Sequence, residues 1–420
     1  MKRHRSSETA FTRKAFFGFR MSCLMVLQKT LKSVQLHLHA LMRSLEDTQE
    51  TTRGSVTAGA WTRARAKLRH TAFIELNEEV LLKEFYRSDA IELFQGRRLL
   101  AIDGSVIALP SSQGVFSVFG EQKAGNQNEG YSKSYAQGQC GVVYDVLNNL
   151  ALKARLDAYG TSELSQARDL LPLALRKGDI VTADRGFANA PFMSCVLAAD
   201  GDFVVRVPRK SFKQSRALFE AKQAGQSVTC DVMVERNSIG RSKGEVIRTR
   251  FVSVDIPGGQ REVIATSLLD EQAYPAQLFG WLYHQRWGVE TYFHELKNRL
   301  DLENFSGRSV ESIYQDFYAM IFVSNYETVL TRPAQEDLTR KKKPTGLPVK
   351  VNHSVSYHLI KEYALDLFFS DLPEEAMLEK LTQLFQQNPN YKRQRDPTAH
   401  NNTSRKTSAN YRKRIRKITF

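Results

Sequence analysis

Residues 97–110 read RRLLAIDGSVIALP, a short apolar run between polar residues that predicts a β-strand. Residues 139–160 read QCGVVYDVLNNLALKARLDAYG, which predicts a hairpin turning at the two Asn residues. A helical pattern at 162–175 and a buried-type strand at 178–187 follow. Three strands, a helix and a fourth strand predict a layered α/β core with mixed rather than purely parallel pairing.

Other segments flank this core. Residues 201–268 are strand-rich and basic, and they predict a β subdomain inserted into the core. Residues 1–95 have mostly helical periodicity, with one long helix expected from about Ser22 to Leu45. A short basic helix follows, for which Thr57 is the expected N-cap. This helix fits either a DNA-reading element or a packed helix with a solvated basic side.

The pattern predicts six successive regions. They are a helical N-terminal domain (1–95), a first core part (96–200), a β insertion (201–268), a second core part (269–330), a helical C-terminal region (331–390) and a basic tail (391–420).

Basic residues outnumber acidic ones, and part of the excess is local. The chain has 60 Lys and Arg against 45 Asp and Glu, a formal charge of +15. The tail at 391–420 alone carries +9. Such an excess favours binding of a polyanion. For the tail, a solvated segment and non-specific phosphate contact are the two alternatives.

Cysteine spacing and apolar runs exclude several classes of protein. The four cysteines lie far apart without a C-x-x-C pair, which favours neither a zinc site nor a disulfide framework and fits a reducing compartment. The sequence has no run of about 18 apolar residues, so no membrane span is predicted. The basic N-terminus lacks a signal cleavage site. The sequence therefore predicts a cytoplasmic protein.

Two acidic residues follow predicted strands. Asp103 precedes a Gly-Ser turn, and Asp184 precedes Arg-Gly-Phe. Carboxylates at the ends of adjacent buried strands converge at one sheet edge, where ligands usually bind in open α/β sheets. Taken alone, each Asp also fits a turn or a helix cap.

A predicted helix at 273–305 supplies a third acid. At about 100° per residue, one of its faces carries a phenol, a guanidinium, a carboxylate and an ammonium group: Tyr283, Arg286, Glu290 and Lys297. An ordinary ion pair between Arg286 and Glu290 is the alternative interpretation. Three carboxylates in one place repel one another unless a cation lies between them, and hard oxygen ligands suit Mg²⁺ or Mn²⁺. Two such ions about 4 Å apart promote phosphoryl transfer, which predicts chemistry on nucleic acid.

These segments resemble a known family. AIDGS around Asp103, TADRGF around Asp184 and YHQRWGVETYFHELK at 283–297 are similar to the signature of bacterial insertion-sequence DDE transposases. The last segment matches the subgroup motif Y-x2-R-x3-E-x6-K at every spacing. The resemblance covers about 97–305 and extends loosely to 55–69.

The resemblance implies a fold and a site. The fold would be a ribonuclease H-like α/β core with an inserted β-strand-rich subdomain, between helical N-terminal and C-terminal regions. Two Mg²⁺ ions, for which Mn²⁺ could substitute, would be held by Asp103, Asp184 and Glu290. Contacts to DNA phosphates would come from four side chains: Tyr283, Arg286, Lys297 and Arg185. Trp287 is expected to pack against the helix rather than to touch DNA.

The resemblance also implies an activity and partners. The enzyme would bind the terminal inverted repeats of an insertion sequence, cleave there, and join the 3′-OH ends to target DNA. It would act as a homodimer or higher oligomer on DNA, in the bacterial cytoplasm or nucleoid. Two alternatives stay open: a catalytically inactive DNA-binding relative, and a ribonuclease H-like nuclease without strand transfer.

Overall fold

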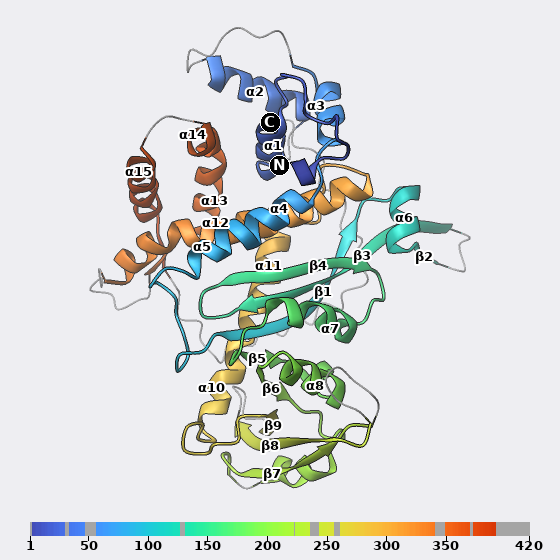
Figure 1. Ribbon diagram of the computed structural model, residues 1–420, viewed down its shortest axis with the longest axis vertical. Helices are drawn as coiled ribbons and strands as arrows, with labels where there is room; N and C mark the ends of the chain where they lie inside the picture. The colour runs from blue at the N-terminus through green and yellow to red at the C-terminus, as the bar shows by residue number, and fades with distance from the viewer. Residues whose placement is uncertain are drawn as a thin grey trace. The chain divides into compact units, whose positions relative to one another are not determined.

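A computed structural model describes residues 2–29, 33–46, 56–126, 131–221, 223–235, 243–255, 261–340, 349–369 and 373–391 (Figure 1). The chain forms two compact units. The sheet unit comprises Glu78–Glu303, and the helical unit combines Met1–Asn77 with Asn304–Phe420. The basic tail from residue 392 onward lies outside the described residues. Among the described helices, none has the length and apolar character that a membrane span requires.

One large mixed β-sheet dominates the sheet unit. Its strands are β1 (Leu99–Leu109), β2 (Gln122–Asn126), β3 (Tyr131–Asp145), β4 (Leu150–Ala158), β5 (Ile180–Ala183), β6 (Asp202–Arg206), β7 (Ser227–Met233), β8 (Val246–Asp255) and β9 (Arg261–Thr266). Its helices are α5 (Lys83–Phe85), α6 (Gln113–Phe119), α7 (Glu163–Ala174), η3 (Arg185–Phe187), α8 (Ala190–Ala198), η4 (Lys213–Ser215), α9 (Arg216–Phe219), α10 (Leu278–Gln285) and α11 (Trp287–Asn298).

Strand β1 lies in the middle of this sheet. On one side β1 pairs antiparallel with β3, which pairs antiparallel with β4. On the other side β1 pairs parallel with β5, and β5 pairs parallel with β6. Figure 1 shows these strands side by side, with β9, β8 and β7 beyond β6 and β2 next to β3. The pairing confirms the predicted mixed α/β core.

The strand-rich segment 201–268 is not a separate subdomain, contrary to the sequence prediction. Its first strand, β6, belongs to the core, and β9 pairs antiparallel with β6 at Val205 and Ala265. Strands β8 and β7 then extend the same sheet. The N–H and C=O groups on the outer edge of β6 therefore form hydrogen bonds with β9, so the core sheet does not end at β6.

Helices α7 and α11 cover opposite faces of the sheet. A Cβ atom on Gly141 of β3 would lie 2.7 Å from Oε1 of Gln166, which belongs to α7. Three residues further along β3, Tyr144 stacks on Tyr292 of α11 with ring centroids 4.7 Å apart. Because successive side chains of a strand alternate between faces, Gly141 and Tyr144 point in opposite directions. Both faces of the central strands are therefore covered, as their continuous apolar sequences require.

Local signals in the sequence are realised at the hairpin and at α7. The turn between β3 and β4 contains Asn149 in the left-handed region, at φ +56°. Asn tolerates this conformation better than most residues. Helix α7 begins after Ser162, whose side chain accepts a hydrogen bond from Ser165 N. The structure confirms both the hairpin and the helix.

The helical unit is built from both ends of the chain. Its elements are η1 (Lys2–His4), α1 (Phe19–Leu27), α2 (Val34–Glu46), α3 (Ala58–Arg65), α4 (Thr71–Glu75), α12 (Val310–Arg340), β10 (Val349–Lys350), α13 (His353–Glu362), α14 (Ala364–Phe369), α15 (Glu374–Gln387) and β11 (Asn390–Tyr391). A π-helical segment, η2 (Leu76–Leu82), spans the residues at which the two units divide. The N-terminal and C-terminal helical regions, which the sequence places in separate domains, belong to one unit.

The single long helix expected near Ser22–Leu45 is two helices, α1 and α2. Lys29, just after α1, has a φ of +29°, which a right-handed helix does not allow. The expected cap of α3 is present, since the Thr57 side chain accepts a hydrogen bond from Ala60 N.

The basic helix α3 packs inside the helical unit through Arg65. The Arg65 guanidinium lies 2.8 Å from Asp316 Oδ1, and both side chains are buried. Arg65 Nε also donates to Gln315 Oε1 at 2.7 Å. Arg63, on another side of α3, is exposed. For Arg65 the packed-helix alternative is therefore the correct one.

Candidate active site

Two of the predicted acids belong to neighbouring parallel strands. Asp103 lies within β1, and Asp184 directly follows β5. Ala101 of β1 pairs with Thr182 of β5. Two residues further along each strand, Asp103 and Asp184 are in equivalent positions, and their side chains project from the same face. The strand register thus brings these two carboxylates together.

Strand β1 does not end at Asp103, contrary to the sequence prediction of a Gly-Ser turn. It continues through Gly104 and Ser105 to Leu109. The reason is the long antiparallel pairing with β3, in which Gly104 is opposite Gly141. Asp103 is consequently held in an extended backbone and not in a turn.

Asp184 also caps the short helix η3. Its Oδ1 accepts a hydrogen bond from Gly186 N at 2.7 Å. Among the described residues, its Oδ2 accepts none, so this oxygen remains available for a ligand. Arg185, the next residue, is exposed.

The third acid lies at the start of α11. The predicted helix at 273–305 is two helices, α10 and α11, which are interrupted at Arg286. The Arg286 side chain is buried, at 6% exposure. Its Nη2 donates to Glu290 Oε1 at 2.6 Å, and its Nη1 lies 3.8 Å from Asp103 Oδ2. Arg286 therefore links the acid of the helix to the acid of β1.

The ion pair between Arg286 and Glu290 is thus present, as the alternative interpretation of this helix predicts. It does not stand alone, because the same guanidinium also faces Asp103. The carboxylate oxygens of Asp103, Asp184 and Glu290 do not all lie within 4.8 Å of one another. Arg286 lies between Asp103 and Glu290.

Burial disfavours a negative charge on Asp103. Burial raises the pKa of its carboxyl to about 6. The Gly104 backbone N–H and the Arg286 charge lower that pKa, whereas the Glu163 and Asp184 carboxylates raise it further. A negative charge on Asp103 is therefore disfavoured in this site unless more positive charge is added.

The aromatic residues near Arg286 differ from expectation in their exposure. Tyr283 is buried, at 3% exposure, and the Arg286 guanidinium lies 5.4 Å from its ring centroid. Trp287 is 51% exposed, although it was expected to pack against the helix. The register of α11 explains this, because Val289 and Tyr292 occupy the buried face instead. Tyr283 and Arg286 are both buried.

Lys297 ties α11 to β1. Its Nζ donates to Ser105 Oγ and to Val106 O, both at 2.7 Å. These contacts join the far end of the helix that carries Glu290 to β1.

Two charged residues near the acids were not predicted from the sequence. Glu163, the first residue of α7, raises the pKa of Asp103 and so lies near it. Arg206 ends β6 next to Asp184 in register, since Ala183 pairs with Val205. An acid in the first turn of a helix is ordinary, and nothing near Glu163 in the sequence connects it with the other acids. The alignment of Arg206 depends on β5–β6 pairing, which composition alone does not fix.

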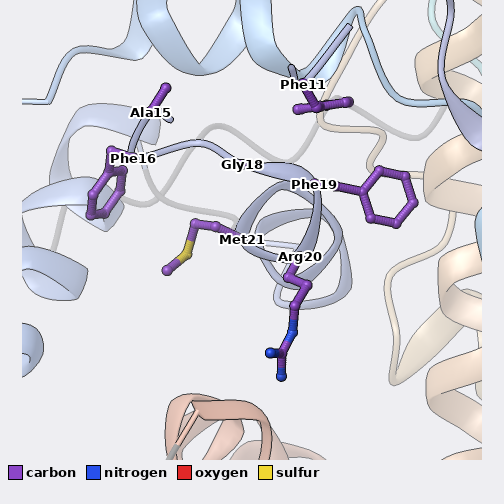
Figure 2. A pocket seen from close by; sticks show the side chains of 7 residues that line it. All are labelled: Phe11, Ala15, Phe16, Gly18, Phe19, Arg20 and Met21. Atoms are coloured by element: carbon purple, nitrogen blue, oxygen red, sulfur yellow. The ribbon is translucent and has the colours of Figure 1, made fainter. Parts of the chain in front are cut away.

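A separate pocket occurs in the helical unit. Figure 2 shows its lining residues, Phe11, Ala15, Phe16, Gly18, Phe19, Arg20 and Met21. None of the acids described above lines this pocket, so it is not part of the candidate active site.

The family assignment follows from comparison with known proteins. The Transposase DDE domain family matches residues 94–326, more than half of the chain. The chain belongs to the Transposase DDE domain family. Asp103, Asp184 and Glu290 all fall inside the matched residues of this DDE domain.

More distant comparisons add little detail about the DDE domain. No curated protein matches the chain. Among solved structures, the chain is similar to a cryo-EM structure of a piggyBac transposase synaptic complex with hairpin DNA. The TM-score is 0.41 at 10% identity, and the likeness covers 88% of this chain and 75% of the other.

Transposase DDE domains use divalent metal ions, and the donor atoms of this DDE domain fit such an ion. Carboxylate oxygens are the ligands that Mg²⁺ and Mn²⁺ prefer. Asp103 Oδ1 and Asp184 Oδ1 each accept one backbone hydrogen bond, from Gly104 and Gly186. Both side chains keep further lone pairs free for a metal. The mutual repulsion at Asp103 is the electrostatic condition that a bound cation relieves.

Proposed function

We propose that this protein is a transposase that binds the ends of an insertion sequence, cleaves them by metal-dependent phosphoryl transfer and joins the 3′-OH ends to target DNA. The observation that carries the proposal is the buried Arg286, which faces both Asp103 and Glu290 within a DDE domain. Strand register supports it, because Asp184 follows β5 at the position equivalent to Asp103 in β1. The spacing of Tyr283, Arg286, Glu290 and Lys297 supports the subgroup defined by Y-x2-R-x3-E-x6-K.

Each acid has a defined part in the proposed reaction. Asp103, Asp184 and Glu290 would hold two Mg²⁺ ions, or Mn²⁺ in their place. When bound, such ions activate a water or 3′-OH nucleophile and stabilise the leaving oxygen. Asp103 is kept in place by strand pairing, and Glu290 by the hydrogen bond from Arg286.

The basic residues divide into two roles. Arg185 is exposed beside Asp184, and we assign it to a DNA phosphate near the scissile bond. Tyr283, Arg286 and Lys297 were expected to contact phosphates as well. Because Tyr283 and Arg286 are buried and Lys297 bonds to β1, we assign these three chiefly to positioning the acids.

A cleavage assay tests the proposed function. The purified chain is incubated with DNA that carries the terminal inverted repeats of its element, with Mg²⁺ or Mn²⁺ and with target DNA. Cuts at the element ends, their loss with a chelator, and joined products in the target DNA are the expected results. Cuts without joining would identify a nuclease without strand transfer, and binding without cuts would identify an inactive relative. Sedimentation of the DNA complex should show two or more protomers, which hold the two ends together.

Arg286→Lys is expected to lower the rate of DNA-end cleavage by about 10²-fold, because small displacements of catalytic groups have effects of that size. Lysine keeps the positive charge, but its single ammonium group cannot face Asp103 and Glu290 at the same time as the planar guanidinium does. DNA affinity should stay near that of the wild type. Arg299→Lys, an exposed change just after α11, is the matched control. A parallel loss of affinity and cleavage would instead make Arg286 a phosphate-binding residue.

Deletion of residues 392–420 is expected to weaken DNA binding and to flatten its salt dependence. This segment carries most of the basic excess of the chain. Each phosphate contact that a protein neutralises contributes about −0.9 to the slope of log K against log salt for duplex DNA. A salt titration of both proteins measures the two slopes, and equal slopes would show that the tail does not contact DNA.

A further inference from the structure

Residues 2–6 pair with the turn between α3 and α4 in the helical unit. Ser6 N donates a hydrogen bond to Lys67 O at 2.8 Å, and Arg69 N donates one to His4 O at 2.9 Å. These two backbone hydrogen bonds hold the short segment along the turn.

The side chain of His4 fixes the same segment. It is buried, and its ring nitrogens lie 2.8 Å from Thr71 Oγ1 and 2.6 Å from Glu75 Oε2. Both partners belong to α4. The 2–6 segment is therefore joined to the turn by its backbone and to α4 by a buried side chain.

The two paired segments concentrate positive charge. Residues 2–5 read KRHR and residues 63–69 read RARAKLR, which together contain seven Lys or Arg and no Asp or Glu. Arg65 and Arg3 are paired with acidic residues. The other five, exposed apart from the half-buried Arg5, form a basic surface on the helical unit: Lys2, Arg5, Arg63, Lys67 and Arg69.

Little negative charge offsets the basic surface. With the described residues, four of its members form no ion pair: Lys2, Arg5, Arg63 and Lys67. Arg69 interacts electrostatically with Glu311. Exposed basic residues of the sheet unit differ, since Arg155 and Arg248 lie 2.7 Å and 3.1 Å from carboxylate oxygens. The basic surface thus keeps an excess of positive charge that a polyanion would neutralise.

Arg5 distinguishes this surface from an ordinary solvated basic face. Its Nε atom is buried and has no hydrogen-bond partner among the described residues. Removing a charged group from water without an anion beside it costs free energy. Solvation accounts for exposed groups such as Arg63 and Lys67, but not for a partly buried guanidinium. An anionic ligand that pairs with Arg5 would offset this cost.

We propose that the basic surface binds the phosphates of duplex DNA independently of the base sequence. The inference rests on the proposed function, because that function makes duplex DNA the polyanion. Phosphate contacts position a protein on DNA and carry no sequence information directly. Hydrogen bonds already fix both segments in the DNA-free protein, so DNA binding requires little further ordering of the backbone.

A salt titration of DNA binding tests the proposal without metal and without any reaction. The full chain and a triple variant, Lys2→Gln with Arg63→Gln and Lys67→Gln, are titrated with an element-end duplex and with a duplex of unrelated sequence. Because each lost phosphate contact changes the slope of log K against log salt by about 0.9, the slope should become less negative by roughly 2.7 and the affinity should fall by about tenfold or more. The loss should be equal on the two duplexes.

A second triple variant is the matched control: Lys83→Gln with Arg87→Gln and Arg248→Gln. It removes the same charge from exposed residues that already have acidic neighbours. Its affinity and slope should stay close to those of the wild type. An equal loss in this control would show that only the net charge matters, and would overturn the proposal.

A charge-keeping variant separates charge from folding. Arg63→Lys with Lys67→Arg should bind DNA like the wild type, because both side chains still place a positive charge near a phosphate. The unfolding temperature of the first triple variant should stay the same or rise, because like charges have been removed. A lower unfolding temperature together with weak binding by the charge-keeping variant would show that these residues only support the fold.

The outcomes separate this proposal from the proposed function. Wild-type affinity and slope in the first triple variant, while the wild type cleaves element ends, would overturn the role of the basic surface and leave the proposed function intact. Weakened binding by that variant, beside a wild type that binds DNA without cutting or joining it, would support the surface and reject the transposase activity. Weakened binding to anionic lipid vesicles with unchanged DNA affinity would identify a membrane contact and overturn the proposal.

Discussion

Asp184→Asn is expected to reduce DNA-end cleavage by about 10³-fold or more, the size of effect seen when a catalytic group is removed. Asparagine can still accept the hydrogen bond from Gly186 that caps η3, so the local fold is kept. It lacks the negative charge that a divalent ion requires. Binding of the element ends should remain close to that of the wild type.

Glu290→Gln should have the same effect, because glutamine keeps a hydrogen-bond acceptor for Arg286 and loses the charge. The double variant should be no worse than either single variant, since groups that act as one unit are not additive. Asp200→Asn is the control. Asp200 is exposed with a φ of +56°, a conformation that asparagine also adopts. Wild-type cleavage by Asp184→Asn or Glu290→Gln would refute the assignment of the acids.

Asp316→Ala is expected to destabilise the helical unit by about 3–5 kcal/mol, the usual result of leaving one partner of a buried ion pair without the other. Asp316 is fully buried and pairs with Arg65. Arg65 would keep its bond to Gln315 but would carry an uncompensated buried charge. The cause is the loss of a specific buried partner and not the loss of side-chain volume.

Urea unfolding followed by tryptophan fluorescence measures this effect. Trp61 is the buried tryptophan of the helical unit, so a background with Trp281→Phe and Trp287→Phe reports on that unit alone. Arg63→Ala, an exposed change on the same helix as Arg65, should alter stability by no more than about 0.5 kcal/mol. Equal stability of Asp316→Ala and the parent protein would show that the ion pair is dispensable.

Short-range patterns predicted much of the sheet unit. Turn residues located the hairpin at the two Asn residues, and the helical pattern at 162–175 located α7. The i, i+4 spacing of Arg286 and Glu290 predicted that their side chains meet, and they form a hydrogen bond although the helix is interrupted at Arg286. Each of these signals involves residues that are close together in the sequence, so a single sequence is enough to detect it.

Features that depend on distant partners were not predictable. Asp103 seemed to end a strand because Gly-Ser resembles a turn, but pairing with β3 carries the strand onward to Leu109. Segment 201–268 looked independent because nothing local shows that β9 pairs with β6. Burial of Arg65 requires Asp316, about 250 positions away along the chain. Glu163 was not predicted because its position beside Gly104 depends on how α7 packs on β1.

The way the two units are assembled from the chain has a consequence for biosynthesis. The sheet unit is continuous, whereas the helical unit needs residues from before position 78 and from after position 303. During translation the first helices leave the ribosome early, but α12, which supplies Asp316 to Arg65 and Asn325 to Asn77, is made only later. The sheet unit can therefore fold before α12, the partner of the first helices, has been synthesised. Termination of translation just after codon 303 would release a chain with every proposed catalytic acid and an incomplete helical unit.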